Sequence, residues 1–265
     1  MQHRSQPLSD CRPVRSDAGI VAAAMSIAGS DSSGGAGIQA DLQAFSFFGV
    51  YGTTAVTAVT AQSPSKVTAV EPLSPQTVER QIQVVCGELN IGAAKTGMLH
   101  SAEIIEAVDR TLARYHGLPL VVDPVLQSQS GAQLLEDDAV QTLTRRLLPR
   151  ATVITPNLGE AEMITGGGIE NGEQMKAAAQ EIAQRYGTWV LLKGGHRDAG
   201  ASDTAEDILC NGSELWCVRT PWCSPETTHG TGCALSAAVT AALSRGWGTL
   251  DAVKNAKAYV YGCLR

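Results

Sequence analysis

The chain has 265 residues, of which 44% are hydrophobic and 17% are charged, a composition typical of a globular domain with a large buried core. Its formal net charge of −6 excludes a strongly basic surface, so neither a nucleic acid nor an anionic membrane is expected as its main partner. No apolar run approaches the roughly 18 residues needed to span a bilayer, so we predict no transmembrane helix.

The sequence predicts one α/β domain behind a short extension. We expect residues 1–18 to form a flexible extension and residues 19–265 to form a single domain. Short apolar runs alternate there with segments of helical periodicity. Strands are expected at residues 20–28, 53–61, 93–99, 119–125, 152–155 and 189–193, with a strand pair near 208 and 216. Helices are expected from residue 38, at 75–89, 101–115 and 137–148, around 160, and at 172–186, 231–244 and 249–263.

This alternation indicates an α/β fold in which a mostly parallel central sheet is covered by helices on both faces. In such sheets, ligands bind at the carboxyl ends of the strands, in the loops that lead to helices. The rule points to residues 29–37, 96–99, 123–125, 155–160 and 193–196, and to the glycine turn before residue 231.

The segment His229-Gly230-Thr231-Gly232-Cys233 carries the strongest local signal for chemistry. Its glycines allow a tight turn that points backbone N–H groups at an anion, at the start of a helix. Cys233 lies in the first turn, where the positive end of the helix favours a thiolate. Two alternatives stay open: a plain loop–helix junction with a packed cysteine, and His229 in place of Cys233 as a base.

The cysteine pattern indicates a reducing environment. The chain has 7 cysteines, an odd number, and no C-x-x-C pair. A disulfide framework or a structural zinc site is therefore not expected in a domain of this size. Reduced thiols in a cytoplasmic protein are the prediction.

The loop 29–37 is rich in glycine and serine, and residues 35–40 fit a variant of the dinucleotide-binding fingerprint. That interpretation requires an acidic residue about 20 positions later for the ribose, and no Asp or Glu lies between Asp41 and Glu71. The loop therefore favours a pocket for a small molecule. Asp41, one turn into the next helix, either holds a polar heterocycle or faces solvent.

Oxygen ligands and a cation follow three of the expected strands. Asp123 precedes a proline at one strand end, and Asn157 and Glu160 follow another. Mg²⁺ is typically held by one or two such carboxylates, with water and phosphates in its other sites. Lys193, before two glycines, offers a point charge to phosphate oxygens. Each motif alone is also typical of a turn or a helix cap, but together they suit phosphoryl transfer.

A series of short motifs, spread in order over residues 20–262, carries a resemblance to a known family. They are residues 26–31 (SIAGSD), 33–41 (SGGAGIQAD), 61–62 (AQ), 95–99 (KTGML), 121–125 (VVDPV), 154–157 (ITPN) with Glu160, 193–196 (KGGH) and 228–233 (THGTGC). The chain resembles the hydroxymethylpyrimidine/phosphomethylpyrimidine kinases, which have the three-layer α/β/α ribokinase-like fold. The resemblance implies that ATP phosphorylates 4-amino-5-hydroxymethyl-2-methylpyrimidine to its monophosphate and then to the diphosphate, in cytoplasmic thiamine biosynthesis.

The resemblance also implies Mg²⁺ as a cofactor, a homodimer, and roles for individual residues. Cys233 would be the base that takes the proton of the substrate hydroxymethyl group. The anion hole would be Gly230, Thr231 and Gly232. The remaining contacts would be made to the pyrimidine by Gly29, Asp41, Gln62, Met98 and Val125, to ATP by Lys193 and Asn157, and to the metal by Asp123 and Glu160.

Two departures from the family pattern bear on activity. Residues 125–131 lack the lysine that members usually carry there, which predicts a less ordered lid or a weaker second phosphorylation. The chain ends at Arg265 without the glycine-rich tail of relatives, which predicts looser nucleotide binding. Two other functions stay open: a kinase for pyridoxal, pyridoxine or pyridoxamine, and a pyrimidine-binding protein with weak catalysis.

Overall fold

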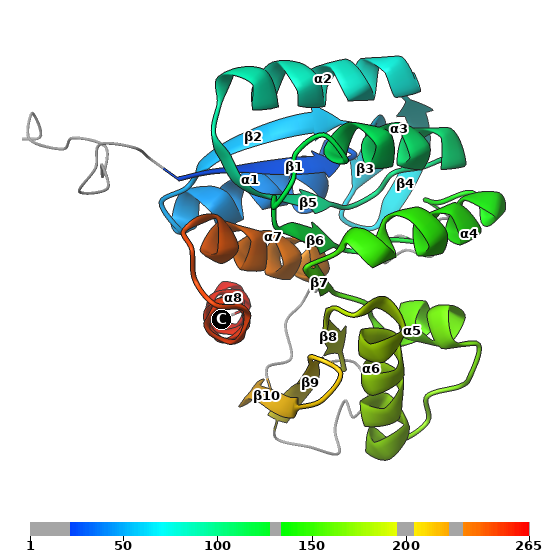
Figure 1. Ribbon diagram of the computed structural model, residues 1–265, viewed down its shortest axis with the longest axis vertical. Helices are drawn as coiled ribbons and strands as arrows, with labels where there is room; N and C mark the ends of the chain where they lie inside the picture. Colours follow the sequence, from blue (N-terminus) through cyan, green and yellow to red (C-terminus); the bar gives the residue numbers. More distant parts are fainter. Residues whose placement is uncertain (1–21, 128–133, 195–203, 223–229, 265) are drawn as a thin grey trace, which may run out of the picture.

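The computed structural model of the chain describes residues 22–127, 134–194, 204–222 and 230–264. In these ranges an eight-stranded sheet has the order β10-β9-β8-β7-β6-β5-β1-β2 (Figure 1). Its strands are β1 (Ala23–Ala28), β2 (Tyr51–Val56), β5 (Ile91–Thr96), β6 (Leu120–Val122), β7 (Val153–Ile154), β8 (Trp189–Lys193), β9 (Thr204–Cys210) and β10 (Leu215–Pro221). Neighbours from β2 to β8 are parallel, and β9 and β10 are antiparallel. The mostly parallel sheet is confirmed.

Helices cover both faces of this sheet, which confirms the three-layer arrangement (Figure 1). One face packs against α2 (Pro75–Glu88), α3 (Ala102–Leu112), α4 (Asp137–Arg146), α5 (Leu158–Thr165) and α6 (Gly172–Tyr186). The other face packs against α1 (Gly37–Phe47), α7 (Thr231–Ser244) and α8 (Thr249–Cys263). A 3₁₀ turn, Leu148–Arg150, precedes β7.

The central strands are apolar on both sides because both faces of the sheet are covered. In β1, Ala24 packs toward α1, α7 and α8, whereas Met25 and Ile27 pack into the opposite core. In β6, Val121 and Val122 divide between the two cores in the same way. Because successive strand side chains point to opposite faces, a strand buried on both sides is a continuous apolar run.

Helix starts follow the expected capping chemistry. The hydroxyl of Ser74 accepts a hydrogen bond from the N–H of Thr77 at 3.2 Å, and Pro75 is the first residue of α2, as predicted. At α5, Asn157 and Glu160 form a reciprocal capping box. The cap holds Glu160 in the first turn, at the carboxyl end of β7.

Helix α7 is buried along residues 235–243, most of which are small. Its small side chains allow the backbone to approach α1, α8 and β5 closely, and α7 contacts all three. The helix therefore has a fixed position against the sheet. Its first turn, with Cys233, is fixed with it.

The segment 53–61, expected as one strand, is two, so that expectation is wrong. β2 ends before Thr57, and β3 (Ala58–Ser63) then leaves the main sheet to pair with β4 (Lys66–Pro72) in an antiparallel hairpin. The buried hydroxyl of Thr57 donates to the carbonyl of Met98 at 2.6 Å and fixes the change of direction. The alternating pattern continues through Thr57, which explains why periodicity alone did not reveal the break.

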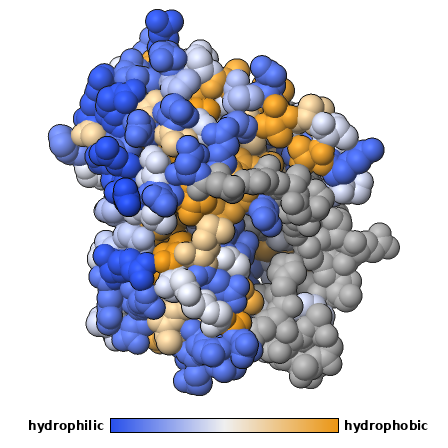
Figure 2. Space-filling view, turned by 90° about the vertical axis from the view of Figure 1, so that its right-hand side faces the viewer, coloured by the Kyte–Doolittle hydropathy of each residue, from blue (hydrophilic) through white to orange (hydrophobic). Residues whose placement is uncertain are grey.

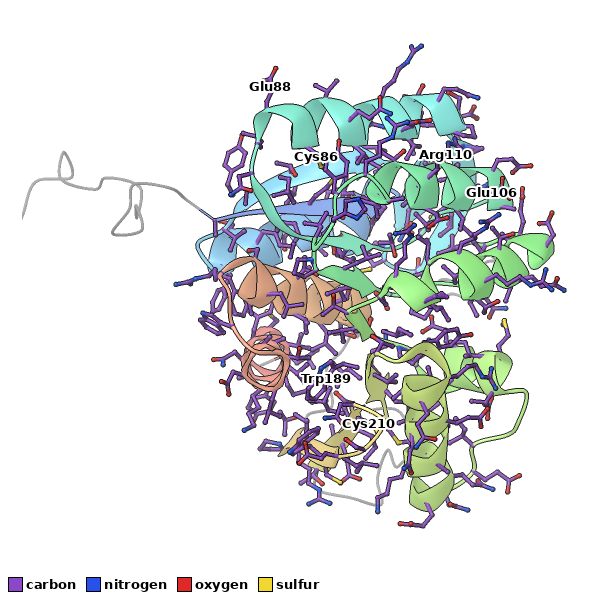
Figure 3. The ribbon with its side chains drawn as sticks, viewed as in Figure 1. Cys86, Glu88, Glu106, Arg110, Trp189 and Cys210 are labelled. Atoms are coloured by element: carbon purple, nitrogen blue, oxygen red, sulfur yellow. The ribbon has the colours of Figure 1, made fainter. Side chains whose placement is uncertain are left out.

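Within the described ranges, no helix is long and apolar enough to cross a membrane. Figure 2 shows hydrophilic side chains over much of one face, with apolar ones gathered toward its middle. The described cysteines are free thiols, and Cys86 on α2 lies far from Cys210 on β9 (Figure 3).

Candidate active site

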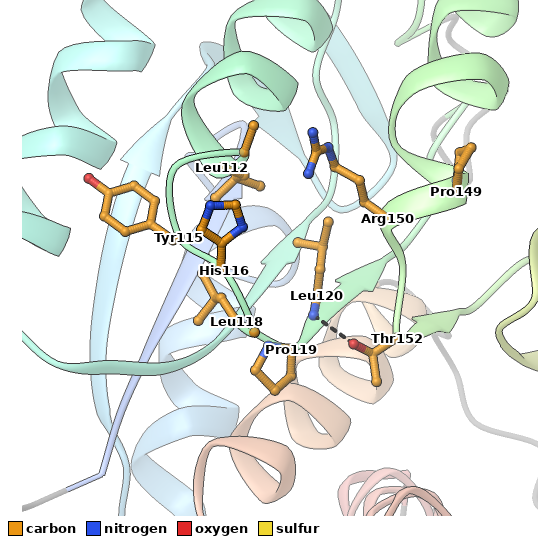
Figure 4. Close-up of a pocket in the computed structure, with 11 residues that line it drawn as sticks. Leu112, Tyr115, His116, Leu118, Pro119, Leu120, Pro149, Arg150 and Thr152 are labelled. Atoms are coloured by element: carbon orange, nitrogen blue, oxygen red, sulfur yellow. Dashed lines mark hydrogen bonds between the residues drawn. The ribbon is translucent and has the colours of Figure 1, made fainter.

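A cavity of about 750 Å³ lies at the carboxyl ends of the parallel strands, where the fold rule places ligands. Every site residue expected from the sequence lines it except Asp41. The lining residues among them are Gly29, Gln62, Met98, Asp123, Val125, Asn157, Glu160, Lys193, Gly230, Thr231, Gly232 and Cys233. A second cavity, of about 430 Å³, lies at the amino-terminal end of β6 and contains none of these residues (Figure 4).

Asp41 lies behind the cavity wall, fully buried. Its carboxylate accepts hydrogen bonds from Lys95 Nζ at 2.8 and 2.9 Å and from Ser26 Oγ at 2.5 Å. Both carboxylate oxygens are therefore engaged by protein groups. Asp41 does not line the cavity, unlike the other four expected substrate contacts.

The turn before α7 packs directly against the glycine loop 29–37. Gly230 caps the helix with φ of 80°, in the left-handed region that favours glycine. A Cβ at Gly230 would lie 1.7 Å from the carbonyl oxygen of Gly35. The two loops thus meet backbone to backbone, and only glycine fits at this contact. Because the first N–H groups of a helix have no partner within it, this turn can bind an anion.

The thiol of Cys233 lies at the cavity wall in the first turn of α7. Burial raises its pKa to about 11, although Lys95 and the backbone N–H of Gly37 oppose the shift. Burial therefore opposes the thiolate that the positive end of the helix is expected to favour.

Asp123 is the hub of a polar cluster on the cavity floor. Its Oδ1 accepts from Lys193 Nζ at 2.9 Å and from Thr155 Oγ1 at 3.1 Å, and its Oδ2 accepts from Ser236 Oγ at 3.1 Å. Burial disfavours the charge of Lys193, but attraction to Asp123 and Glu160 outweighs it and raises the pKa of the amine. Lys193 therefore keeps its positive charge, as contact with phosphate requires.

Asp123 and Glu160 supply the oxygen atoms that a magnesium ion prefers. No group of three or more His, Cys, Asp or Glu side chains in the described ranges is arranged to hold a metal. Mg²⁺ commonly binds through one or two protein carboxylates and takes its other ligands from phosphates and water. The charge of Asp123 is close enough to disfavour the charge of Glu160, and a divalent cation would relieve that repulsion. The residues fit a metal that is shared with a bound nucleotide.

Replacing Glu160 with glutamine will raise stability at pH 8 by about 1–3 kcal/mol. Burial, with a contribution from Asp123, raises the pKa of Glu160 from 4.5 to about 7, and Lys193 opposes the shift. Between these values the folded protein holds a proton that the unfolded chain has lost. The contribution of Glu160 to the free energy of unfolding therefore falls as the pH rises from 4.5 to about 7, and the full loss is present at pH 8. Glutamine at this position can keep the helix cap, and it does not ionise, so it avoids this loss of stability.

Urea unfolding of the wild type and of Glu160→Gln at pH 5 and pH 8 measures this effect. The gap in unfolding free energy between the two proteins is expected to widen at pH 8. An equal gap at both pH values would mean that Glu160 ionises normally in the folded protein.

The family of the chain follows from its similarity to known proteins. The phosphomethylpyrimidine kinase family model matches residues 31–265. The chain belongs to this family. A hydroxymethylpyrimidine/phosphomethylpyrimidine kinase of Rhizobium meliloti (strain 1021) is 46% identical over 248 residues, which are 92% of this chain and 91% of that protein.

Solved structures agree with the family assignment. A phosphomethylpyrimidine kinase from Clostridium difficile 630 has a TM-score of 0.80 and 41% identity, over 92% of this chain and 99% of that one. A pyridoxal kinase from Staphylococcus aureus, in complex with AMP-PCP and pyridoxal, has a TM-score of 0.83 and 34% identity, over 93% of this chain and 88% of that one. The ribokinase-like fold is confirmed, and the glycine loop belongs to a kinase pocket rather than a dinucleotide site.

Asp31, which was not expected as a site residue from the sequence, organises the glycine loop of this phosphomethylpyrimidine kinase family member. One carboxylate oxygen accepts from the N–H and the hydroxyl of Ser33, at 2.9 and 2.7 Å, and the other accepts from the N–H of Ala36 at 2.8 Å. Asp31 also lines the cavity. An aspartate two residues before a serine in a loop is a recognisable turn signal that could have identified it.

A charged pair that was not expected from the sequence lies at the side of the cavity formed by β9 and α8. Lys257 Nζ donates to Asp207 Oδ2 at 2.5 Å, and the other oxygen of Asp207 accepts from the N–H of Gly194 at 3.0 Å. The two residues are far apart in sequence, so no local pattern predicts their contact. Some expected features lie outside the described residues, namely those at His196, at His229 and in most of the 125–131 segment.

Proposed function

We propose that this chain is a kinase that transfers the γ-phosphoryl group of ATP to the hydroxyl of 4-amino-5-hydroxymethyl-2-methylpyrimidine, and then to the monophosphate formed, in thiamine biosynthesis. One observation carries the proposal: the start of helix α7, a thiol, a lysine and two carboxylates surround one cavity. Membership in a kinase family implies ATP as the phosphate donor. The homodimer and the cytoplasmic location stay predictions.

The geometry supports a role for each side of the cavity. The N–H groups at the start of α7 would stabilise the negative charge that gathers on the transferred phosphoryl group. Lys193 would hold phosphate oxygens of ATP, and Asn157 lies beside it at the same end of the sheet, joined to it by a bridge between backbones. Asp123 and Glu160 would hold Mg²⁺, which when bound neutralises phosphate charge.

Cys233 would act as the general base. As the substrate oxygen attacks the γ-phosphorus, its O–H bond breaks and the proton passes to the Cys233 sulfur, while the bond from phosphorus to the ADP oxygen breaks. The sulfur must be ionised at that moment, so the raised pKa of the thiol has to be overcome. The anion turn and nearby cations are the groups placed to do so.

The pyrimidine would bind where Gly29, Gln62, Met98 and Val125 line the cavity. A Cβ at Gly29 would lie 2.9 Å from the sulfur of Met98, so glycine leaves room for the Met98 side chain at the wall. The hairpin that holds Gln62 is tied to the glycine loop, because Ser32 Oγ bonds to both the N–H and the carbonyl of Gln62 at 2.8 Å. The amide of Gln62 is a suitable partner for the ring nitrogens and the amino group.

Incubation of the full chain with Mg-ATP and the hydroxymethylpyrimidine, followed by mass analysis, tests the proposal. Monophosphate and diphosphate are both expected. The similarity to a pyridoxal kinase makes phosphorylation of pyridoxal the second candidate activity, so a parallel reaction with pyridoxal belongs in the experiment. Phosphorylation of pyridoxal alone would replace the proposed function, and binding of the pyrimidine without turnover would indicate a binding protein.

A further inference from the structure

A buried ion pair lies behind the wall of the proposed site, and neither of its residues lines the cavity. Lys95 on β5 and Asp41 on α1 have fully buried side chains, joined at 2.8 Å, and Ser26 on β1 donates to the same carboxylate. Removing two such charges from water costs several kcal/mol per ion, and replacing a buried pair with apolar side chains is often neutral or stabilising. Stability alone is therefore a poor explanation for this pair.

The position of Lys95 relates it to the cavity. A Cβ added at Gly97, a residue of the cavity wall, would lie 3.5 Å from Lys95 Nζ, so the amine lies directly behind that wall. Helix α7, which carries Cys233 in its first turn, packs on both β5 and α1. The pair is therefore enclosed between the sheet and the helix that holds the thiol.

The charges around Cys233 do not act equally. Lys95 favours its thiolate, whereas Asp41 and Asp123 disfavour it, and the effect of Lys95 is the largest of the three. Lys193 on β8 also lies near this turn, because a Cβ at Gly232 would lie 3.4 Å from its Nζ, and a thiolate at Cys233 favours the charged amine. Burial alone would lower the pKa of Lys95, but Asp41, Cys233 and Asp123 outweigh burial and raise it, so the amine keeps its proton.

We propose that Lys95, held in place by Asp41 and Ser26, is a positioning residue that stabilises the thiolate of Cys233 from behind the cavity wall. Asp41 then fixes the amine and at the same time weakens its effect on the sulfur. This inference deepens the proposed function, since a base must be ionised to accept the proton. In this proposal Asp41 binds Lys95 and does not bind the substrate.

Alkylation of Cys233 by iodoacetamide in the full chain, measured by peptide mass mapping, tests the inference without any substrate. The rate follows the fraction of thiolate. Lys95→Met is expected to slow alkylation of Cys233 at pH 8 by about tenfold or more, the effect of one pKa unit. Asp41→Asn is expected to slow it as well, because loss of the counter-ion lets burial lower the pKa of Lys95 and remove its positive charge. Other cysteines in the same digest serve as internal controls.

The pH profile separates charge from packing. Loss of the Lys95 charge is expected to move the rate–pH profile of Cys233 alkylation to higher pH, whereas a purely structural change would alter the rate by the same factor at each pH, and that result would overturn the proposal. The double variant Lys95→Met/Asp41→Asn leaves no unpaired buried charge and serves if a single variant fails to fold. It is expected to react more slowly than the wild type, and a wild-type rate would also overturn the proposal.

Steady-state kinetics keep the two proposals distinguishable. If Lys95 acts through the base, Lys95→Met lowers kcat while the KM for the pyrimidine changes little. Rates of alkylation that shift as expected, together with unchanged kcat, would support the electrostatic role of Lys95 and contradict Cys233 as the base.

Discussion

Replacing Cys233 with serine will lower kcat by about 10²- to 10⁴-fold, the range that general-base catalysis typically contributes. A serine hydroxyl ionises far less readily than a thiol in the same half-buried position, so it accepts the proton of the substrate hydroxyl poorly. The KM for the pyrimidine should remain close to that of the wild type, because the ring contacts lie elsewhere in the cavity. Steady-state kinetics with saturating Mg-ATP measure both quantities.

Cys86→Ser is the matched control, since Cys86 is a half-buried cysteine on α2 whose pKa burial also raises. We expect it to retain wild-type kcat. Full turnover by Cys233→Ser would show that positioning and charge neutralisation are sufficient, or that another group takes the proton.

Replacing Gly230 with alanine will reduce kcat/KM by about 10²- to 10³-fold or more, comparable to the loss of an oxyanion-hole donor. The new Cβ would lie 1.7 Å from the carbonyl oxygen of Gly35, so either the anion turn or the glycine loop must move. Both loops line the cavity, and either movement misplaces the N–H groups that would stabilise the phosphoryl group. Activity and unfolding free energy are measured on the same preparation.

Gly246→Ala separates backbone strain from this contact. Gly246 follows the other end of α7 with φ of 82°, close to the 80° of Gly230, and a Cβ there meets nothing within 4 Å. Both variants carry the strain of a left-handed alanine, which costs about 1–2 kcal/mol. Only Gly230→Ala should lose activity, and equal activity in the two variants would mean that the loop contact has no catalytic role.

Much of the site could be predicted because parallel sheets gather their ligands at one edge. Asp123, Glu160 and Lys193 lie at the carboxyl ends of different strands, and the strand order brings them into one cluster. Local chemistry was equally informative at helix starts: the Ser74 cap of α2 is present as predicted. These features depend on short segments and on a general rule of topology.

The remaining features depend on contacts between distant segments. Asp41 and Lys95 are 54 positions apart, and nothing near either residue in the sequence shows that they pair. The pKa of Cys233 depends on how deeply α7 is buried, which the helix start does not reveal. The break at Thr57 depends on its hydrogen bond to Met98, 41 positions later. In each case tertiary structure outweighed a correct local pattern.

The ratio of kcat/KM for the hydroxymethylpyrimidine to kcat/KM for pyridoxal, measured with Mg-ATP on the full chain, tests the central claim most directly. We predict that the pyrimidine is the better substrate and that turnover yields both its monophosphate and its diphosphate. A higher kcat/KM for pyridoxal, or no turnover of the pyrimidine at all, would contradict the assignment.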